Sequence, residues 1–491
     1  MFGAALMLFT AWRSTGFIQG DEHFQVLEFA NARLGLSPTT ALAPEYAARA
    51  RSFLLPMVAA AVRRAMRMVG SDDPFLCAFF LRAIASLLYL CCARRLARAS
   101  ITWFSSHTLW RWAVAGSLAL WFVPVVAGRF SAESISGSLF FLALITIARL
   151  GDDEPCTDRE LFLAGLALGF ACVARFQVVF LEAGAAAWLV SARKANVRAW
   201  VIPVAAWMVA LAAGLGIDRW GYGVWTFSAW NYYRYNITDG VLRQFGVAPW
   251  WWYFPALLYK AGPPFGVALI AGFIALCVRR PRSLLVWTAV PFVLFHLIVV
   301  HKEVRFLFPM LAAASYFVVL AVDALVPANA RPGSTRWVRA LAALVVMIDA
   351  GAFVIRMAVP LQPRIDVQAA VYHSPLRTMF IVGDGGDPYE SFGLESYWYR
   401  PPGLRIIRAA SVADAQRGAA AAGGALVVTR YPVVADTMSG ACRMVHASIE
   451  ARHPALFSRD LLEPLTPSPV REPWWWFVTA CGARAELAVV R

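Results

Sequence analysis

Long apolar runs follow one another from residue 2 to residue 358, and they limit the chain to one kind of fold. A helix needs roughly 17 to 25 predominantly apolar residues to cross a bilayer, and the sequence contains about eleven runs near that length. This pattern predicts an all-α polytopic membrane protein with about 11 transmembrane helices. The helix count depends most on the fifth and sixth runs, which are short and crowded. The runs occupy approximately residues 2–18, 75–93, 112–127, 133–149, 161–176, 178–191, 200–217, 253–278, 283–300, 304–326 and 337–358.

Composition and charge support the same class. The 491 residues are 60% hydrophobic and 15% charged, which is too apolar for a soluble globular chain. The net charge of +15 does not indicate a nucleic-acid partner, because Lys and Arg fall between the apolar runs. If the N-terminus is cytoplasmic, the inner loops follow the positive-inside rule, with Arg94, Arg95, Arg98, Arg111, Arg193, Lys194, Arg198, Arg279, Arg280, Arg282, Arg331 and Arg336.

This orientation places the polar segments with chemical potential on one side of the membrane. Segments 19–74, 128–134, 218–252 and 301–305 all fall on the outer side. The first run lacks the basic start and the small-residue cleavage site of a signal peptide, so we expect it to be a retained span. The Ala- and Arg-rich composition favours a bacterial inner membrane with the site facing the periplasm; in a eukaryote the same side would be the lumen of the endoplasmic reticulum.

A group of polar side chains follows the first apolar run directly. The residues with catalytic or binding potential are Asp21, Glu22, His23, Gln25 and Glu28. They lie where a membrane span meets water and where a lipid-borne substrate presents its head group. The alternative for Asp21 is a structural role as a helix cap. For Gln25 and Glu28 the alternative is packing against neighbouring helices.

A second polar group lies in the short outer loop before residue 304. His301, Lys302, Glu303 and Arg305 are costly to desolvate at a membrane boundary unless they have partners. Lys302 and Arg305 offer a point charge and a planar fork to a phosphate, which predicts an anion site. The alternative is that Glu303 pairs with a neighbouring cation and the loop caps two helices.

The outer loop 19–74 also contains basic residues. Apolar residues at helical spacing in Ser52–Val69 predict a helix in the membrane surface, beside lipid phosphate groups or merely anchored by them. The arginines on which this interpretation rests are Arg49, Arg51, Arg63, Arg64 and Arg67.

The composition changes after the last apolar run. Residues 359–491 contain no run of membrane length, and they predict a small α/β domain outside the membrane, whereas residues 1–358 form the transmembrane domain. Cys442 and Cys481 lie in this domain, where oxidation is possible, so a disulfide between them is a hypothesis. We interpret Gly383–Asp387 as a plain turn, because a phosphate loop needs a spaced lysine and a following helix. The expected strands are Met379–Val382, Leu404–Ile407, Ala425–Thr429 and Leu487–Val490.

Several of these segments together resemble the signature of glycosyltransferase family 22, the multispanning α-mannosyltransferases of GPI-anchor and N-glycan assembly and their bacterial relatives. The specific pieces are Gly20-Asp21-Glu22-His23-Phe24-Gln25 with Glu28, and His301-Lys302-Glu303 with Arg305-Phe306 and Pro309. The resemblance extends over roughly residues 1 to 310. The supporting pieces are Arg51-Ser52 with Pro56, Arg129-Phe130 with Glu133-Ser134, Arg175-Phe176-Gln177, Asn231-Tyr232-Tyr233 through Asn236, Gly246 and Pro249-Trp250.

The resemblance implies the GT-C fold, a sugar donor carried on a polyprenyl phosphate, and inversion at the anomeric carbon. We therefore expect a hexosyltransferase, most simply an α-mannosyltransferase, that acts on a lipid-linked or glycan acceptor on the extracytoplasmic face. No cofactor and no metal are expected, since no cluster has metal-ligand spacing. The alternatives are a lipid or sugar transporter and a non-catalytic subunit of a glycan-assembly complex.

The chemistry assigns roles to the two polar groups. An acceptor hydroxyl is a poor nucleophile at neutral pH, so a carboxylate must take its proton; Asp21 is the first candidate and Glu22 the second. The departing phosphate gains negative charge, which Lys302 and Arg305 would stabilise, with His301 as a hydrogen-bond donor. The supporting or substrate-binding candidates are His23, Gln25, Glu28, Arg51, Arg129, Glu133 and Glu303.

Overall fold

The computed structural model of the chain describes residues 2–151, 154–192, 196–326, 336–383, 386–430, 442–448, 452 and 476–482. Its contacts divide the chain into two compact units. The first unit comprises Met1–Trp12, Pro44–Val62 and Phe79–Ile355. The second comprises Arg13–Ala43, Arg63–Ala78 and Arg356–Arg491. The predicted domain division at residues 358 and 359 stays a prediction.

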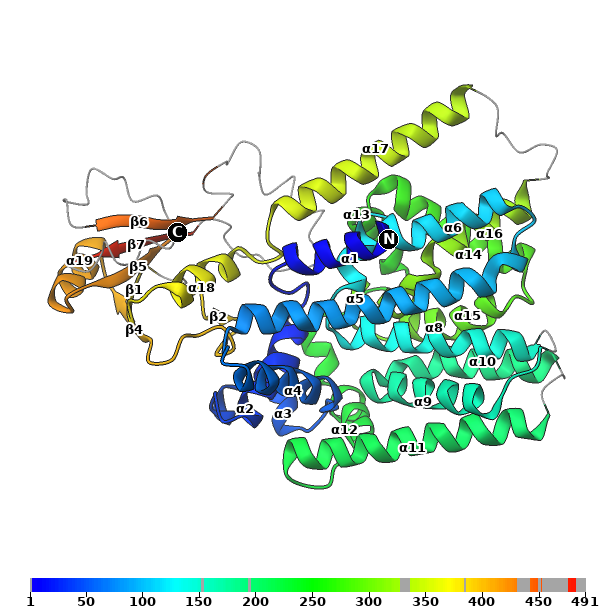
Figure 1. Cartoon of the computed structure of the whole chain (residues 1–491), viewed down its shortest axis with the longest axis horizontal. Helices are drawn as coiled ribbons and strands as arrows, with labels where there is room; N and C mark the ends of the chain where they lie inside the picture. Colours follow the sequence, from blue (N-terminus) through cyan, green and yellow to red (C-terminus); the bar gives the residue numbers. More distant parts are fainter. Residues whose placement is uncertain are drawn as a thin grey trace. The chain divides into compact units, whose positions relative to one another are not determined.

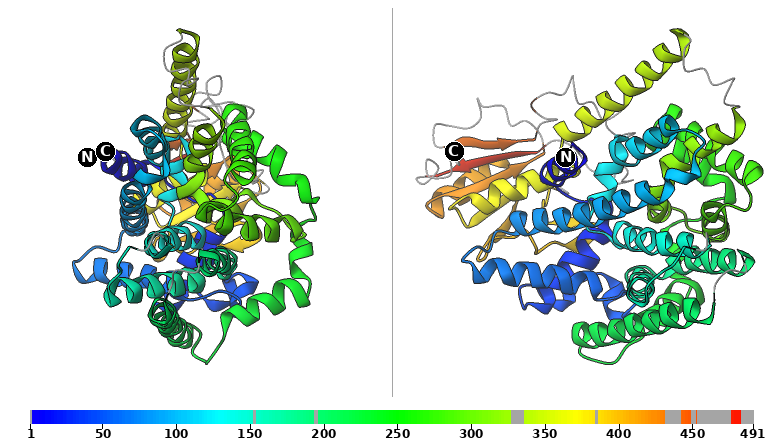
Figure 2. Two further views of the ribbon diagram at one scale, coloured as in Figure 1. Left: turned by 90° about the vertical axis from the view of Figure 1, so that its right-hand side faces the viewer. Right: turned by 45° about the vertical axis from the view of Figure 1, so that its right-hand side comes forward.

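Helices build the first unit (Figure 1 and Figure 2). Helix α9 packs against α8 and α11, α10 packs against α15, and α14 packs against α16. Phe140, Leu181 and Tyr316 are buried in a core to which α8, α10, α14, α15 and α16 contribute. The helices are α1 (Phe2–Arg13), α3 (Pro44–Ala47), α4 (Leu54–Met68), α5 (Pro74–Ala99), α6 (His107–Ala119), α7 (Phe122–Ala127), α8 (Ala132–Gly151), α9 (Asp158–Ala174), α10 (Val179–Ala192), α11 (Val197–Tyr222), α12 (Ser228–Tyr233), α13 (Tyr253–Ala261), α14 (Pro263–Arg279), α15 (Leu284–Ile298), α16 (Ala314–Leu325) and α17 (Arg336–Ala358).

The apolar runs predicted from the sequence are helical, but local backbone chemistry interrupts some of them. The run 253–278 divides into α13 and α14 because Gly262 has a φ of 87° and Pro263 opens the next helix. The run 112–127 divides into α6 and α7, and the run 2–18 is helical only as far as Arg13. The predicted spans 2–18, 112–127 and 253–278 are therefore wrong as single continuous helices.

Among the described residues, five helices are long and apolar enough to cross a membrane. They are Pro74–Trp103, Ala132–Gly151, Val197–Tyr222, Val304–Leu325 and Ala340–His373. Phe176–Ala192, Pro263–Arg279 and Leu284–Ile298 are shorter apolar helices. The chain is therefore a membrane protein with several apolar helices, while the count of eleven spans stays a prediction.

The segment that follows the His301–Arg305 loop packs closely against α8. The loop continues into a 3-10 helix, Val304–Ala313, which packs against α8. A Cβ on Gly137 of α8 would lie 2.5 Å from the carbonyl oxygen of Pro309, so only glycine allows this approach. The contact places two polar segments side by side that are far apart in the sequence.

A mixed sheet forms the centre of the second unit. Its strand order is β4-β1-β5-β7-β6, with β1 parallel to β4 and β5, and β7 antiparallel to β5 and β6. A separate hairpin pairs β2 with β3. The elements are α2 (Glu28–Arg33), α18 (Pro363–His373), β1 (Thr378–Val382), β2 (Glu390–Ser391), β3 (Leu394–Glu395), β4 (Arg405–Ala409), α19 (Val412–Ala421), β5 (Ala425–Thr429), β6 (Cys442–Ala447) and β7 (Phe477–Cys481).

Alternating side chains give this sheet two cores. Met379 and Ile381 of β1 pack with Val367 of α18, whereas Phe380 between them packs with Ala415 and Ala419 of α19. This is the period of two that a strand buried on both faces requires. The predicted strands at 379–382, 404–407 and 425–429 are confirmed as β1, β4 and β5. The predicted strand Leu487–Val490, and residues 384 and 385 of the predicted turn, lie outside the described residues.

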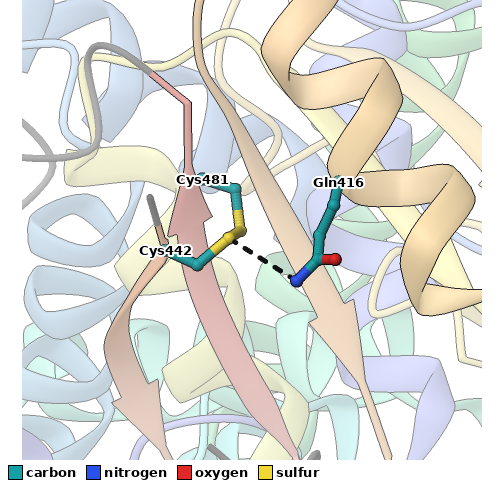
Figure 3. The surroundings of a disulfide bond; sticks show 3 residues. All are labelled: Gln416, Cys442 and Cys481. Atoms are coloured by element: carbon teal, nitrogen blue, oxygen red, sulfur yellow. Dashed lines mark hydrogen bonds between the residues drawn. A yellow bond between two sulfur atoms is a disulfide. The ribbon is translucent and has the colours of Figure 1, made fainter. Parts of the chain in front are cut away.

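A disulfide joins the last two strands. Cys442 of β6 and Cys481 of β7 are register partners and are bonded to each other, which confirms the hypothesis from the sequence. Figure 3 shows the bond beside Gln416 of α19, whose Nε2 lies 3.9 Å from Cys442 Sγ. The bond links the edge strand β6 to its neighbour β7.

Candidate active site

The predicted site residues fall into two groups, one in each unit. Asp21, Glu22, His23, Gln25 and Glu28 belong to the second unit. The residues His301–Arg305, with Arg51, Arg129 and Glu133, belong to the first unit. Each group is described by itself.

The first group lies on an unusual helix. Residues Glu22–Leu27 form a π-helical turn that leads into α2. Such wide turns are rare and often occur at functional sites. The Glu22 carboxylate accepts hydrogen bonds from the backbone N–H groups of Ile18 (3.1 Å) and Gln19 (3.3 Å). Glu22 therefore secures the turn before the helix, which is the structural role that the sequence left open for Asp21.

Exposure separates the two candidate bases. Glu22 is buried, with 8% of its surface exposed, and its carboxylate is occupied by backbone groups. Asp21 is half-buried at the start of the same helix. A general base needs access to the acceptor hydroxyl. The geometry therefore favours Asp21 over Glu22.

His23 and Glu28 connect this helix to a later segment of the same unit. His23 Nε2 lies 2.7 Å from Ser396 Oγ and 2.9 Å from Glu28 Oε1. Glu28 Oε1 also accepts hydrogen bonds from the backbone N–H groups of Tyr397 and Trp398, each at 2.8 Å. Both side chains are almost fully buried. These contacts favour a positioning role for His23 and Glu28 over contact with a sugar, and Gln25 is buried as well.

Arg63 differs from its prediction. The helix expected at 52–69 is present as α4, but Arg63 does not lie on its exposed polar side. Arg63 donates to Asn31 Oδ1 at 2.6 Å, and its guanidinium lies 4.7 Å from the centre of the Trp398 ring. Asp72 lies 3.2 Å from its Nε. Arg63 and these partners all belong to the second unit, and the partners bury Arg63. The prediction of a lipid-facing Arg63 is therefore wrong, whereas Arg64 and Arg67 are exposed.

The second group begins with the loop after α15. Lys302 is buried, and its Nζ donates to the carbonyl oxygens of Val299 (2.5 Å) and Ala248 (3.2 Å). Burial lowers the pKa of Lys302. Glu303 Oε1 accepts from Arg305 Nη2 at 2.8 Å and lies 3.0 Å from His301 Nε2. Burial raises the pKa of Glu303, but Arg305 and His301 outweigh this effect and lower it to about 2.

Buried ion pairs connect this loop to α8 and α9. Glu133 Oε1 lies 2.7 Å from Arg175 Nη1 and 3.9 Å from Arg305 Nη1. Glu133 lies in the first turn of α8, and Arg175 ends α9. Both guanidinium groups lie over the ring of Phe306, at 5.3 Å for Arg175 and 5.5 Å for Arg305. With Lys302 of the same loop, three cations accompany the two carboxylates of Glu133 and Glu303, and this excess of positive charge suits an anion.

Arg51 lies in a neighbouring aromatic group. Its guanidinium lies 5.1 Å from the centre of the Tyr232 ring, and Gln177 Nε2 donates to Tyr232 Oη at 2.5 Å. The loop that carries Arg51 is held by Asp218, whose carboxylate accepts from the backbone N–H of Phe53 at 2.7 Å. Arg129 is buried four residues before Glu133. The contacts of Tyr232 bring together Arg51 and Gln177, which lie in separate motifs of the sequence.

Sequence reasoning missed the roles of Arg175 and Asp218. Both are charged residues at the end of an apolar run, and that position was the available signal. Among the described residues, the structure contains no group of three or more His, Cys, Asp or Glu side chains that could hold a metal ion.

Comparison with known proteins identifies a family for most of the chain. The model of the Alg9-like mannosyltransferase family matches residues 1–373. The GPI alpha-1,2-mannosyltransferase 3 of Xenopus laevis is 25% identical over 305 residues, which cover 60% of this chain and 54% of that protein. The mannosyltransferase APTG1 of Arabidopsis thaliana is 24% identical over 322 residues, covering 65% and 57%. The chain therefore spans about half the length of the curated relatives it matches.

A solved structure shares the fold. The crystal structure of ArnT from Cupriavidus metallidurans bound to undecaprenyl phosphate superposes with a TM-score of 0.55. The sequences are 12% identical, and the match covers 97% of this chain and 96% of ArnT. This likeness confirms the predicted GT-C fold.

Proposed function

The chain belongs to the Alg9-like mannosyltransferase family, and we propose that it is a membrane-embedded inverting glycosyltransferase that transfers a hexose, most simply mannose, from a polyprenyl-phosphate donor. The acceptor is a lipid-linked or glycan hydroxyl. The relatives named above are mannosyltransferases, which supports the sugar. The ArnT structure contains undecaprenyl phosphate, and this is the class of donor lipid that we propose.

The observation that carries this proposal is the buried cationic cluster of the first unit. Arg175 and Arg305 pair with the carboxylates of Glu133 and Glu303, and Lys302 lies in the same loop as Arg305. All three cations are at most 9% exposed. Burying such charges is costly unless an anion or a carboxylate compensates them. A polyprenyl phosphate would supply the additional negative charge. Lys302 and Arg305 would stabilise the oxygen that departs, and Glu303 would hold Arg305 and His301 in place.

The base belongs to the second unit in this proposal. Asp21 would take the proton of the acceptor hydroxyl while that oxygen forms a bond to the anomeric carbon. The bond between the anomeric carbon and the phosphate oxygen breaks at the same time, and its electron pair leaves with the polyprenyl phosphate. Attack from the opposite face inverts the anomeric configuration. The reaction needs no oxidant, reductant or cofactor.

We place this chemistry on the extracytoplasmic side of the membrane. The Cys442–Cys481 disulfide supports an oxidising compartment for the second unit. The basic loops predicted to face the cytoplasm support the same orientation. A lipid-linked donor suits this side, since nucleotide sugars are cytoplasmic.

The test is a transfer assay with purified protein in lipid nanodiscs. Radiolabelled mannosyl-phosphoryl-polyprenol is incubated with a glycolipid extract, and labelled glycolipid is separated from the donor. We expect transfer by the wild type and loss of at least about a hundredfold in kcat for Asp21→Asn. We expect little change for the control Asp414→Asn, which alters a partly exposed carboxylate of α19. Lys302→Met should raise the KM for the donor and lower kcat.

Two results would contradict different parts of the proposal. If the wild type transfers sugar from none of a panel of polyprenyl-phosphate sugars, the activity is wrong. If Asp21→Asn keeps full activity, the activity stands but the assignment of the base fails.

A further inference from the structure

The β2–β3 hairpin of the second unit holds an aromatic residue in an unfavourable conformation. Ser391 pairs with Leu394, which leaves a two-residue turn of Phe392 and Gly393. Their φ angles are 55° and 73°, so both residues are left-handed, as in a type I′ turn. Asn, Asp and Gly suit the first position of such a turn, and a bulky residue there is an outlier. The turn by itself therefore does not explain phenylalanine.

The Phe392 ring lies against the helix that carries Asp21. Its centre is 6.3 Å from that of Phe24, with the two rings edge to face at 87°. A Cβ on Gly20 would lie 3.0 Å from the Phe392 ring, so a side chain at residue 20 would displace it. Gly20 directly precedes Asp21, and Phe24 lies one helical turn further. Both contacts therefore place the ring against the helical turn that includes Asp21, the proposed base.

The ring is also available to a ligand. Phe392 is 58% exposed, although Gly20 and Phe24 contact part of it. It lies beyond residue 373, where the family model ends. An exposed aromatic ring held in place by two contacts and a strained backbone is a feature that function explains better than folding does.

We propose that Phe392 is one wall of the acceptor subsite and that a sugar ring of the acceptor stacks on it, an inference that rests on the proposed function. The C–H groups on the apolar face of a pyranose carry partial positive charge and suit the negative face of an aromatic ring. A phosphate does not suit that face. The subsite therefore takes the glycan part of the acceptor, and the donor phosphate binds elsewhere.

Steady-state kinetics distinguish the effect of the Phe392 ring on acceptor binding from the effect of the turn conformation on folding. Phe392→Ala should raise the KM for the acceptor by about three- to tenfold and leave the KM for the donor unchanged. Phe392→Asn should do the same, although it suits the turn better and should not lower the melting temperature. Phe392→Tyr should keep the wild-type KM. Met444→Ala, which truncates another exposed apolar side chain of the same unit, is the control and should change neither KM.

A leucine variant distinguishes a sugar from the bilayer. An exposed phenylalanine could instead anchor the hairpin in the membrane surface, and leucine would serve that purpose equally well. Sugar stacking requires Phe392→Leu to behave like Phe392→Ala. If Phe392→Leu behaves like the wild type while Phe392→Ala is impaired, the ring contacts lipid and the proposal is overturned.

A binding measurement keeps the inference testable without turnover. Saturation-transfer NMR of octyl α-mannoside and octyl β-glucoside on the protein in nanodiscs reports which ligand protons contact the protein. We expect saturation of the sugar C–H protons with the wild type and its loss with Phe392→Ala. Equal sugar signals for the two proteins, or an unchanged acceptor KM in an active enzyme, would overturn the subsite and leave the proposed function intact. A sugar signal that depends on Phe392 in a protein without transferase activity would support the subsite and refute the proposed function.

Discussion

Glu133 and Arg175 form a buried ion pair, with 2.7 Å between Oε1 and Nη1 and with 6% and 3% of the two side chains exposed. The pair joins the first turn of α8 to the end of α9. Glu133 also lies near Arg305 of the loop that follows α15. Glu133 therefore holds α8, the end of α9 and the loop after α15 together at the proposed phosphate site.

Removal of one partner of this pair should be strongly destabilising. In Glu133→Gln, Arg175 stays buried without a full counter-charge, and we expect a loss of about 3–5 kcal/mol in the free energy of unfolding. The double variant Glu133→Met/Arg175→Met should lose less than either single variant, because it leaves no uncompensated charge at this pair. Thermal unfolding in the same detergent checks both. A Glu133→Gln protein as stable as the wild type would contradict the prediction.

Glu303 should make stability depend on pH in the acid range. Its folded pKa of about 2 lies below its ordinary value of 4.5. A carboxyl with a lowered folded pKa stabilises the fold above its unfolded pKa, and this contribution disappears as pH falls through the folded pKa. The effect should therefore be complete above about pH 4.5 and be lost progressively toward pH 2.

Glu303→Gln is the matched variant for this prediction. Its melting temperature should be lower than that of the wild type at neutral pH, and the difference should shrink as the pH falls below 4.5. Melting temperatures measured for both proteins from neutral pH to about pH 3 provide the check. A difference that stays constant across this range would show that Glu303 does not titrate as described.

Glu28 should position the proposed base without touching substrate. Its Oε1 accepts hydrogen bonds from the backbone N–H groups of Tyr397 and Trp398, and His23 lies against it. In Glu28→Ala the helix that carries Asp21 loses these contacts, and we expect kcat to fall about 10- to 100-fold with little change in the KM for the donor. Steady-state kinetics with a varied donor give this split.

Two further variants test the same positioning role. Glu28→Gln keeps an acceptor oxygen for the backbone donors and should recover part of the activity. Glu395→Gln changes a carboxylate of the adjacent hairpin that is exposed, and it should be neutral. A tenfold rise in the KM for the donor in Glu28→Ala, with kcat unchanged, would assign Glu28 to substrate binding instead.

The Cys442–Cys481 disulfide should stabilise the sheet of the second unit. The two cysteines are 39 residues apart, and closing a loop of this length contributes roughly 2–4 kcal/mol. The double variant Cys442→Ser/Cys481→Ser should therefore unfold at a lower temperature. A reductant should lower the melting temperature of the wild type and leave the variant unchanged. Equal melting temperatures for the oxidised wild type and the variant would refute the prediction.

The sequence predicted the broad architecture because hydrophobic periodicity is a local property. The apolar runs became helices, and β1, β4 and β5 lie where short apolar stretches separated by Gly and Pro indicated strands. The predicted helix boundaries were less accurate where a single backbone conformation divides an apolar run. The division of the run 253–278 at Gly262 depends on one backbone conformation that hydrophobicity does not encode.

The sequence also identified most candidate site residues, but the contacts that distinguish one candidate from another were not visible in it. Glu22 and Asp21 are neighbours with the same functional group, and the structure shows that Glu22 is buried and accepts from the backbone N–H groups of Ile18 and Gln19, whereas Asp21 is half-buried. Arg63 was expected among exposed arginines of α4, and Asn31 and Trp398 bury it. Arg175 lies in a supporting motif of the sequence, and its pairing with Glu133 makes it part of the cationic cluster.

The sequence by itself determined that this protein is a membrane-embedded helical chain with a smaller sheet domain, and its motifs indicated the family. These properties follow from composition, periodicity and short motifs, each of which is contained in neighbouring residues. Only the tertiary structure decided that Glu28 holds residues 397 and 398, that Glu133 joins Arg175, and that Phe392 lies against Gly20. Such contacts join residues tens to hundreds of positions apart, and they exist only once packing has fixed which buried charges and rings face each other.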